Sequence, residues 1–340
     1  MKIHKLATSP AFVVIDLDGA ETSVGVVRAA NKILQAGAVA LARSTTYTLA
    51  SLERRAGGAA AGISAESDAR PGAIAAFVAE VAELAPAHGL VLDPGAGVDA
   101  AALEPLAGAD PRGTLHRTAH DGVPLAVDLT ALGAASAADV AVGGLDGRTV
   151  ALEGAGPVAG PLAAELVARG ARIVALSGPG GVAIDAAGLD PEAVRRGGAA
   201  VATLTSDPAP AAALFGAEAD VIFCGSRQGM LDGDVAEALA ARVVVPTGCQ
   251  PLSAKGLAVL RRRGVVALPD FLTTAGPAFA WWPTAGATVA TVRAAADEGI
   301  ATLVGEVLDA EDGPLLGACY RAEAFLRTWR DELPFGRPLA

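Results

Sequence analysis

The chain has 340 residues, of which 52% are hydrophobic, and its formal net charge at pH 7 is −11. That length supplies material for about two domains. The negative charge argues against broad binding to nucleic acids or anionic membranes, both of which need a basic surface. With no uninterrupted apolar run of about 18 residues and no signal-peptide pattern at the start, we expect a cytoplasmic protein whose partners are small molecules.

Cysteine and histidine give little support to a disulfide framework or a metal site. Cys224, Cys249 and Cys319 are widely separated, whereas disulfide scaffolds and four-ligand zinc sites need more cysteines at closer spacing. His116 and His120 are four residues apart, but they lie in a stretch rich in turn-forming residues, without a companion ligand in helical register. We therefore predict no metal.

Residues 1–142 are predicted to form an α/β lobe. Residues 12–16 are a β-rich run, and apolar residues recur at helical spacing over 73–84. A further helix is predicted over 128–141, and the glycine-rich turn at 143–147 follows it. We place a domain boundary at this turn.

From residue 143 to 285 short apolar strands alternate with helices. This alternation is typical of a parallel sheet with crossover helices. The strands are predicted at 148–152, 172–176, 221–223, 243–245 and 265–268, and the helices at 161–169, 234–241 and 254–262. Residues 286–340 are predicted to be a helical segment that packs back on the rest. The predicted class is thus α/β, with an N-terminal α/β lobe and a Rossmann-type doubly wound parallel sheet.

The loop after the first of these strands predicts a dinucleotide site. Gly154, Gly156 and Ala159 match a G-x-G-x-x-A pattern, with Pro157 and Val158 between them. Such a loop combines a tight turn, close backbone approach and a helix N-terminus that faces the pyrophosphate. The pattern alone is weak in a chain with 41 glycines, but its position between a predicted strand and a predicted helix favours nucleotide binding over a structural turn.

The acidic residue that usually holds the ribose hydroxyls is missing. It should end the second strand, but Ser177 and Gly178 stand there. Either the cofactor carries a 2′-phosphate, or the nucleotide is held differently, or the site has lost it. The cofactor is therefore predicted as NAD or NADP.

Several segments together resemble the glutamate/leucine/phenylalanine/valine dehydrogenase family. The segments are 147–190, 221–225, 247–253 and 261–282, preceded by the helix that starts at Asp128. The resemblance implies an NAD(P)-dependent amino-acid dehydrogenase fold and a homo-oligomer assembled through the N-terminal lobe. It also implies that Thr130, Cys224, Gly225 and Cys249 lie at the cofactor and Thr274 beside the substrate.

Upstream, residues 45–50 and 57–63 resemble the family's active-site segment, but both of its lysines are missing. The lysine that binds the substrate carboxylate falls on Thr48, and the catalytic lysine falls on Ala60. The catalytic aspartate falls near Gly95, with Asp93 as the nearest carboxylate. Oxidative deamination needs a cation for the α-carboxylate and a tuned acid–base pair. The ordinary reaction of the family is therefore unsupported.

Two hypotheses remain open. The first is a divergent oxidoreductase that moves a hydride between NAD(P) and an imine, amine or carbonyl compound, with Tyr47 and Asp93 as candidates for the proton relay. Packing of Tyr47 and a turn-capping role for Asp93 are the plainer interpretations of these two residues. The second is a catalytically inactive homologue with a nucleotide-binding, regulatory or assembly role.

Overall fold

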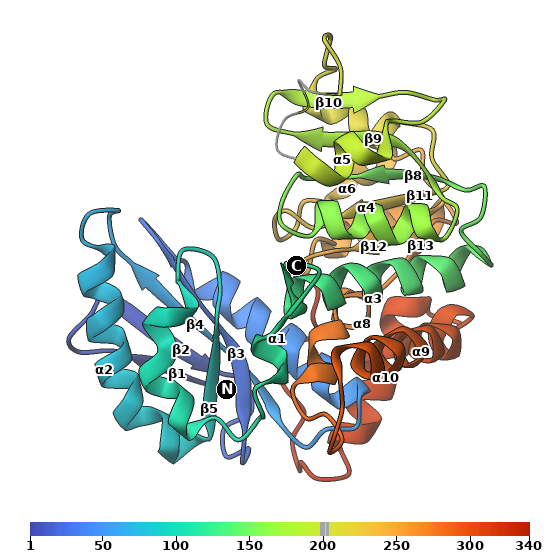
Figure 1. The fold of residues 1–340 in the computed structure, drawn as a ribbon. Coiled ribbons are helices and arrows are strands. Elements are labelled where there is room, and N and C mark those ends of the chain that lie inside the picture. The colour runs from blue at the N-terminus through green and yellow to red at the C-terminus, as the bar shows by residue number, and fades with distance from the viewer. Residues whose placement is uncertain (198–200, 202–203) are drawn as a thin grey trace. The chain divides into compact units, whose positions relative to one another are not determined.

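The computed structural model describes residues 1–197, 201 and 204–340, and these form two compact units (Figure 1). The first unit comprises Met1–Arg112 with Cys319–Pro338, and the second comprises Gly113–Ala318 with Leu339–Ala340. The predicted boundary at residue 143 lies inside the second unit, because helix α3 (Leu125–Val142) packs against α4 (Ala159–Ala168) and α9 (Val289–Leu308). The C-terminal segment is shared between the two units.

The first unit is built on a five-stranded sheet with the order β1-β2-β4-β3-β5. Strands β3, β4 and β5 are parallel, while β2 is antiparallel to β4 and β1 to β2. The strands are β1 (Lys2–Lys5), β2 (Ala11–Ile15), β3 (Ser23–Ala30), β4 (Gly57–Ser64) and β5 (Leu90–Pro94). The helical elements of this unit are α1 (Gln35–Ser51), α2 (Arg70–His88), the 3₁₀ segment η1 (Ala100–Ala109) and the C-terminal part of α10 (Pro314–Leu326).

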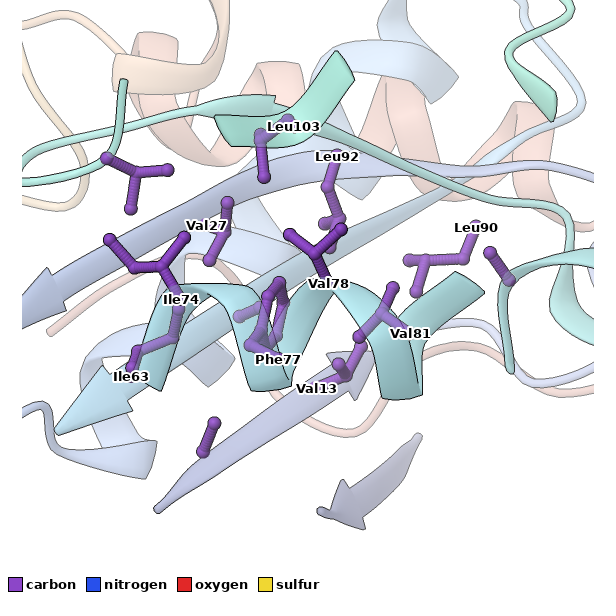
Figure 2. Packing of buried hydrophobic residues seen from close by; sticks show 14 of the residues in the cluster. Val13, Val27, Ile63, Ile74, Phe77, Val78, Val81, Leu90, Leu92 and Leu103 are labelled. Atoms are coloured by element: carbon purple, nitrogen blue, oxygen red, sulfur yellow. The ribbon is translucent and has the colours of Figure 1, made fainter. Parts of the chain in front are cut away.

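Strand β2 separates the two cores of this unit, because alternate side chains of a strand point to opposite faces of its sheet. Val13 and Ile15 pack in the cluster that includes Phe77 of α2, shown in Figure 2. Phe12 and Val14 pack with Ala38, Ala42 and Ala60 at α1. The sheet is therefore covered by α2 on one face and by α1 on the other.

The second unit contains the predicted Rossmann-type sheet, with six strands in the order β10-β9-β8-β11-β12-β13. All neighbours are parallel except β10, which is antiparallel to β9. The strands are β8 (Thr149–Leu152), β9 (Arg172–Gly178), β10 (Gly181–Ile184), β11 (Val221–Cys224), β12 (Val243–Pro246) and β13 (Val266–Ala267). The α/β class and the parallel sheet are confirmed. The chain passes from β8 outward to β9 and later returns to β11 on the other side of β8, which makes the β8–β11 junction the topological switch point.

The connections of this unit are mostly helical. They are η2 (Leu115–Arg117), α5 (Pro191–Gly197), η4 (Ala211–Gly216), α6 (Gly233–Ala238), α7 (Ala254–Arg262), α8 (Asp270–Thr273) and η5 (Gly276–Ala280), with a small β6 (Ala119–His120) and β7 (Val123–Pro124) hairpin before α3. Helix α3 alone among the described residues is long and apolar enough to cross a membrane, but 61% of it is buried. Its packing against α4 and α9 is that of a core helix.

Candidate dinucleotide site and the first-unit residues

The turn between β8 and α4 has the backbone conformation that a dinucleotide loop needs. Gly154 has a φ of +88°, which residues other than glycine rarely adopt. Its N–H donates a 3.0 Å hydrogen bond to Oγ of Ser177 at the end of β9. Two residues predicted from separate motifs are therefore in direct contact, and this contact joins the loop to the neighbouring strand.

Gly156 leaves room for a ligand at the start of α4. A Cβ atom added there would meet no described atom within 4 Å. Pro157 and Val158 then lead into α4. Its first N–H group, that of Ala159, donates to the carbonyl of Gly156 at 3.0 Å, and Pro161 has no N–H, so it is the positive end of the helix dipole that favours an anion here. The residues present therefore fit a pyrophosphate group.

The end of β9 offers no carboxylate to a ribose. Ser177 is 8% exposed, and Gly178 is followed by a glycine-rich turn into the antiparallel strand β10. The Ser177 hydroxyl accepts from Gly154, so it holds the loop in place. Ser177 and Gly178 thus end β9, and the choice between NAD and NADP stays open.

Sequence reasoning missed Glu153, the residue directly before the glycine loop. Oε2 of its half-buried side chain accepts hydrogen bonds from the backbone N–H groups of Gly225, at 3.1 Å, and Ser226, at 3.0 Å. This carboxylate thus bridges the carboxyl ends of β8 and β11 at the switch point. An acid immediately preceding a G-x-G pattern was the available signal.

The carboxyl ends of β11 and β12 lie close together because a glycine follows each strand. A Cβ atom on Gly225 would lie 2.3 Å from the backbone nitrogen of Gly248, so neither strand end can carry a larger residue without movement. Cys224 beside it is fully buried, and burial, with a smaller contribution from the charge of Glu153, raises the pKa of its thiol. Cys249 is half-buried. Cys224 is therefore a packing residue rather than a reactive thiol.

The remaining predicted site residues of this unit make local contacts. The hydroxyl of Thr130 donates to the carbonyl of Ala126 at 2.7 Å, and that of Thr274 donates to the carbonyl of Asp270 at 2.7 Å. The buried carboxylate of Asp270 accepts from the backbone N–H of Gln250, which has a φ of +46°. Asp270 therefore supports the strained turn after β12, a role for which the sequence offered no pattern.

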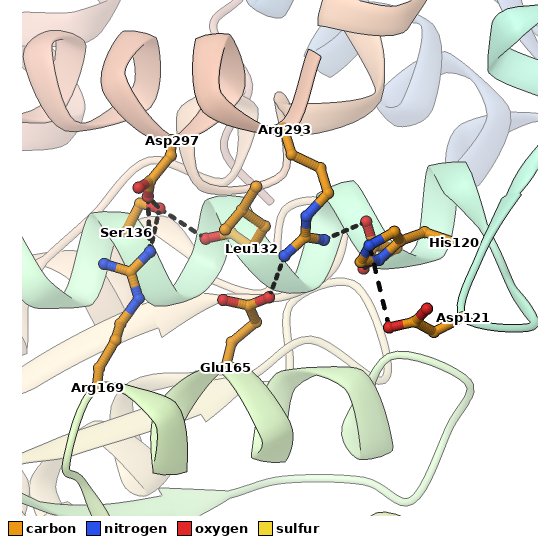
Figure 3. A network of polar contacts seen from close by, with 9 residues as sticks. His120, Asp121, Leu132, Ser136, Glu165, Arg169, Arg293 and Asp297 are labelled. Carbon is orange, nitrogen blue, oxygen red and sulfur yellow. Dashed lines mark hydrogen bonds and ion pairs between the residues drawn. The ribbon is translucent and has the colours of Figure 1, made fainter. Parts of the chain in front are cut away.

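A network of charged side chains ties α4 to α3 and α9 (Figure 3). Arg293 on α9 contacts Asp128 on α3 and donates to Glu165 on α4 at 2.5 Å. Asp128 also contacts His120 at 3.1 Å. In parallel, Arg169 after α4 donates to Asp297 on α9 at 2.6 Å. The helix that begins at the glycine loop is therefore held by ion pairs from both neighbouring helices.

The predicted site residues of the first unit lie in its packed interior. Thr48 on α1 is 7% exposed, and Ala60 on β4 is fully buried in the core that α1 covers. The Tyr47 hydroxyl donates to Glu323 at 3.1 Å. Burial, together with the charge of Glu323, raises the pKa of this phenol. A phenol in this state is a poor acid–base group near neutral pH.

Asp93 at the end of β5 is held by a bidentate ion pair. Its two carboxylate oxygens accept from the two terminal nitrogens of Arg112, at 2.6 and 2.8 Å, and Arg112 also binds Asp110. The Arg112 side chain is fully buried. Gly95, two residues on, would place a Cβ atom 2.9 Å from the side chain of Arg28. The carboxylate nearest to the expected catalytic position is thus part of a structural cluster.

Comparisons with known proteins agree with this fold. Residues 122–279 match the family model of the Glutamate/Leucine/Phenylalanine/Valine dehydrogenases. The match covers a little under half of the chain and supports membership of this family. The family resemblance predicted from the motifs is thereby confirmed, whereas the individual site residues stay predictions.

The relatives matched by sequence are glutamate dehydrogenases. That of Aeropyrum pernix is 31% identical over 144 residues, which is 41% of this chain and 34% of that protein. The NADP-specific glutamate dehydrogenase of Saccharolobus shibatae is 28% identical over 163 residues, 46% of this chain and 38% of the relative. The matched segment thus spans little more than a third of each relative.

Solved structures of the family resemble nearly the whole chain. The hetero-hexameric glutamate dehydrogenase of Thermus thermophilus, in a Leu-bound form, has a TM-score of 0.76 at 22% identity and covers 95% of this chain and 86% of its own. L-tryptophan dehydrogenase from Nostoc punctiforme has a TM-score of 0.64 at 16% identity, covering 96% and 95%. At such identities these likenesses show the fold.

Proposed function

We propose that this chain is a nicotinamide-dinucleotide-binding homologue of the amino-acid dehydrogenases that no longer deaminates α-amino acids and has a regulatory or assembly role. One observation carries the binding part. The glycine loop combines a left-handed Gly154, open space at Gly156 and the N-terminus of α4, all at the switch point of the sheet.

The loss of deamination is supported by the contacts of the first unit. The two positions that carry lysine in the family are a buried threonine and a buried alanine, and the chain's four lysines are Lys2, Lys5, Lys32 and Lys255. The two candidate acid–base groups, Tyr47 and Asp93, are bound to Glu323 and Arg112. Arginine does not serve as a general base at neutral pH.

The second candidate function is an NAD(P)-dependent oxidoreductase that acts on an imine, amine or carbonyl compound. The intact glycine loop favours it, because hydride transfer can rely on positioning and on the cofactor itself. Under either candidate function we propose a cytoplasmic oligomer. A homo-oligomer is the simplest form, and light scattering of the purified protein measures its mass.

The deciding experiment separates binding from turnover. Purified protein is titrated with NAD, NADP, NADH and NADPH separately. Melting temperature is followed for all four, since a ligand of the native state must raise it, and nicotinamide fluorescence is followed for the two reduced forms. Turnover is then measured with α-amino acids, 2-oxo acids with ammonia, and simple imines and carbonyl compounds. Saturable binding without turnover supports the first function, and saturable turnover of a compound that is not an α-amino acid supports the second.

Two results would contradict the proposal. If neither dinucleotide binds in its oxidised or its reduced form, the glycine loop is a structural turn. If the chain oxidises an α-amino acid at rates usual for enzymes, the claim that deamination has been lost is wrong.

A further inference from the structure

The charge at the switch point is a feature of this chain that neither candidate function explains. Glu153 follows β8, and Oε2 of its carboxylate accepts from the backbone N–H groups of Gly225 and Ser226 after β11. Hydrogen bonds from two N–H groups to a carboxylate are charge-assisted and hold it in place. A fixed negative charge therefore lies beside the loop proposed to receive the pyrophosphate.

These contacts also place the charge on one side of the site. The carboxylate is directed to the β11 side of β8, whereas the loop's other contact, from Gly154 to Ser177, is to the β9 side. A dinucleotide bound at a switch point lies across it, with the adenosine ribose over the second strand of the fold, here β9. The nicotinamide half would then lie on the β11 side, where Glu153 is directed.

The nicotinamide ring carries a positive charge when it is oxidised and none when it is reduced. A carboxylate on the same side of a partly desolvated site attracts the charged ring and has no such attraction for the neutral one. Successive backbone N–H groups such as those of Gly225 and Ser226 also form an anion-binding surface, which Glu153 already occupies. A phosphate of the ligand therefore does not replace Glu153 at those two N–H groups, and the carboxylate stays in the site.

We propose that Glu153 is a specificity-determining residue that makes this site favour the oxidised over the reduced nicotinamide dinucleotide. This inference rests on the proposed function, because it presupposes binding at the glycine loop. It assigns the chain a ligand class, the oxidised dinucleotides, and it ascribes the preference to a single charge.

The experiment measures dissociation constants for the oxidised and reduced forms of one dinucleotide by calorimetry, in the intact chain and in Glu153→Gln. We expect the substitution to shift the ratio of the two constants by about tenfold in favour of the reduced form, the size expected for one partly screened charge pair. Glu153→Asp keeps the charge and should retain the preference of the unmodified chain.

Asp220→Asn is the matched control. Asp220 lies at the opposite, amino-terminal end of strands β8 and β11. There its carboxylate accepts from the backbone N–H and the hydroxyl of Thr149. Removing this charge should leave the ratio unchanged. The role of Glu153 is overturned if the ratio of the two constants shifts equally in Glu153→Gln, Glu153→Asp and Asp220→Asn. It is also overturned if both forms bind to Glu153→Gln with an unchanged ratio. Either result contradicts this inference without contradicting the proposed function. If the intact chain binds neither form, the proposed function fails, and this inference fails with it.

Discussion

Glycine has different structural roles in the two glycine-rich segments of this chain. In the first unit, a Cβ atom on Gly58 would lie 1.9 Å from the carbonyl oxygen of Ala42, and one on Gly62 would lie 2.5 Å from Ile33. In the second unit, a Cβ atom on Gly156 would meet nothing. Glycine thus makes room for the chain's own helix in one segment and leaves space for a ligand in the other.

Polar side chains bind one another in both units, but at different places relative to the predicted site residues. In the first unit the pair Asp93–Arg112 takes up a predicted site residue itself. In the second unit the ion pairs of Arg293 and Arg169 hold α4, and the glycine loop before that helix lies outside them. The comparison teaches that a family motif can persist as packing in one unit, while in the other it has the backbone conformation of a dinucleotide-binding loop. Four predictions test this contrast, from the largest expected effect to the smallest.

Asp16→Ala should destabilise the protein by about 3–5 kcal/mol, because it leaves a buried Arg43 without its carboxylate. The guanidinium of Arg43 now binds both oxygens of Asp16, and the two side chains are 5% and 0% exposed. Denaturant unfolding measures the loss. The double variant Asp16→Leu with Arg43→Met should recover much of it. A loss below 1 kcal/mol in Asp16→Ala would show that the pair is unimportant.

Gly58→Ala should destabilise the protein by about 3 kcal/mol, because α1 cannot stay in contact with β4 when a methyl group meets the backbone of Ala42. Thermal unfolding followed by circular dichroism measures this effect. Dinucleotide affinity, extrapolated to conditions where the variant is folded, should be unchanged. Wild-type stability in this variant would mean that α1 and β4 are not in close contact.

Gly156→Ala, the same chemical change in the other segment, should leave stability within about 0.5 kcal/mol of the original, because the added methyl group faces open space. Dinucleotide affinity should fall at least tenfold, or about 1.4 kcal/mol, since the backbone can no longer approach the pyrophosphate closely. Fluorescence titration measures it. Unchanged affinity in a folded variant would place the ligand elsewhere.

Glu323→Gln should destabilise the protein by about 1 kcal/mol at pH 7 and by less in acid. Burial by itself raises the pKa of this carboxyl, but the ion pair with Arg337 and the hydrogen bond from Tyr47 outweigh it and hold the pKa below its ordinary value of 4.5. A lowered pKa stabilises the fold above pH 4.5, and this contribution is lost as the pH falls through the folded-state value. Melting curves from pH 7 to pH 3 should therefore converge for the two proteins. A constant difference would contradict the pKa shift.

The second unit was easier to predict from sequence than the first. Its strands are short runs of Val, Ile, Leu and Phe between turn residues, the pattern of buried parallel strands. Strand β4 in the first unit, Gly57–Ser64, consists of glycine and alanine apart from Ile63 and Ser64, and residues 23–30 and 181–184 also gave no prediction of a strand. β4 is a strand because β2 and β3 pair with both of its edges.

What the sequence determined by itself is the local chemistry: the glycine spacing after β8, the missing ribose acid at Gly178, and the absence of lysine at Thr48 and Ala60. These follow from residue identity and short-range pattern. Only the tertiary structure decided that Asp93 pairs with Arg112, that Tyr47 donates a hydrogen bond to Glu323, and that Glu153 connects the ends of two strands. Those contacts join residues 19, 276 and 72 positions apart, and separations of that size are set by the packing of helices and sheets, which no local pattern encodes.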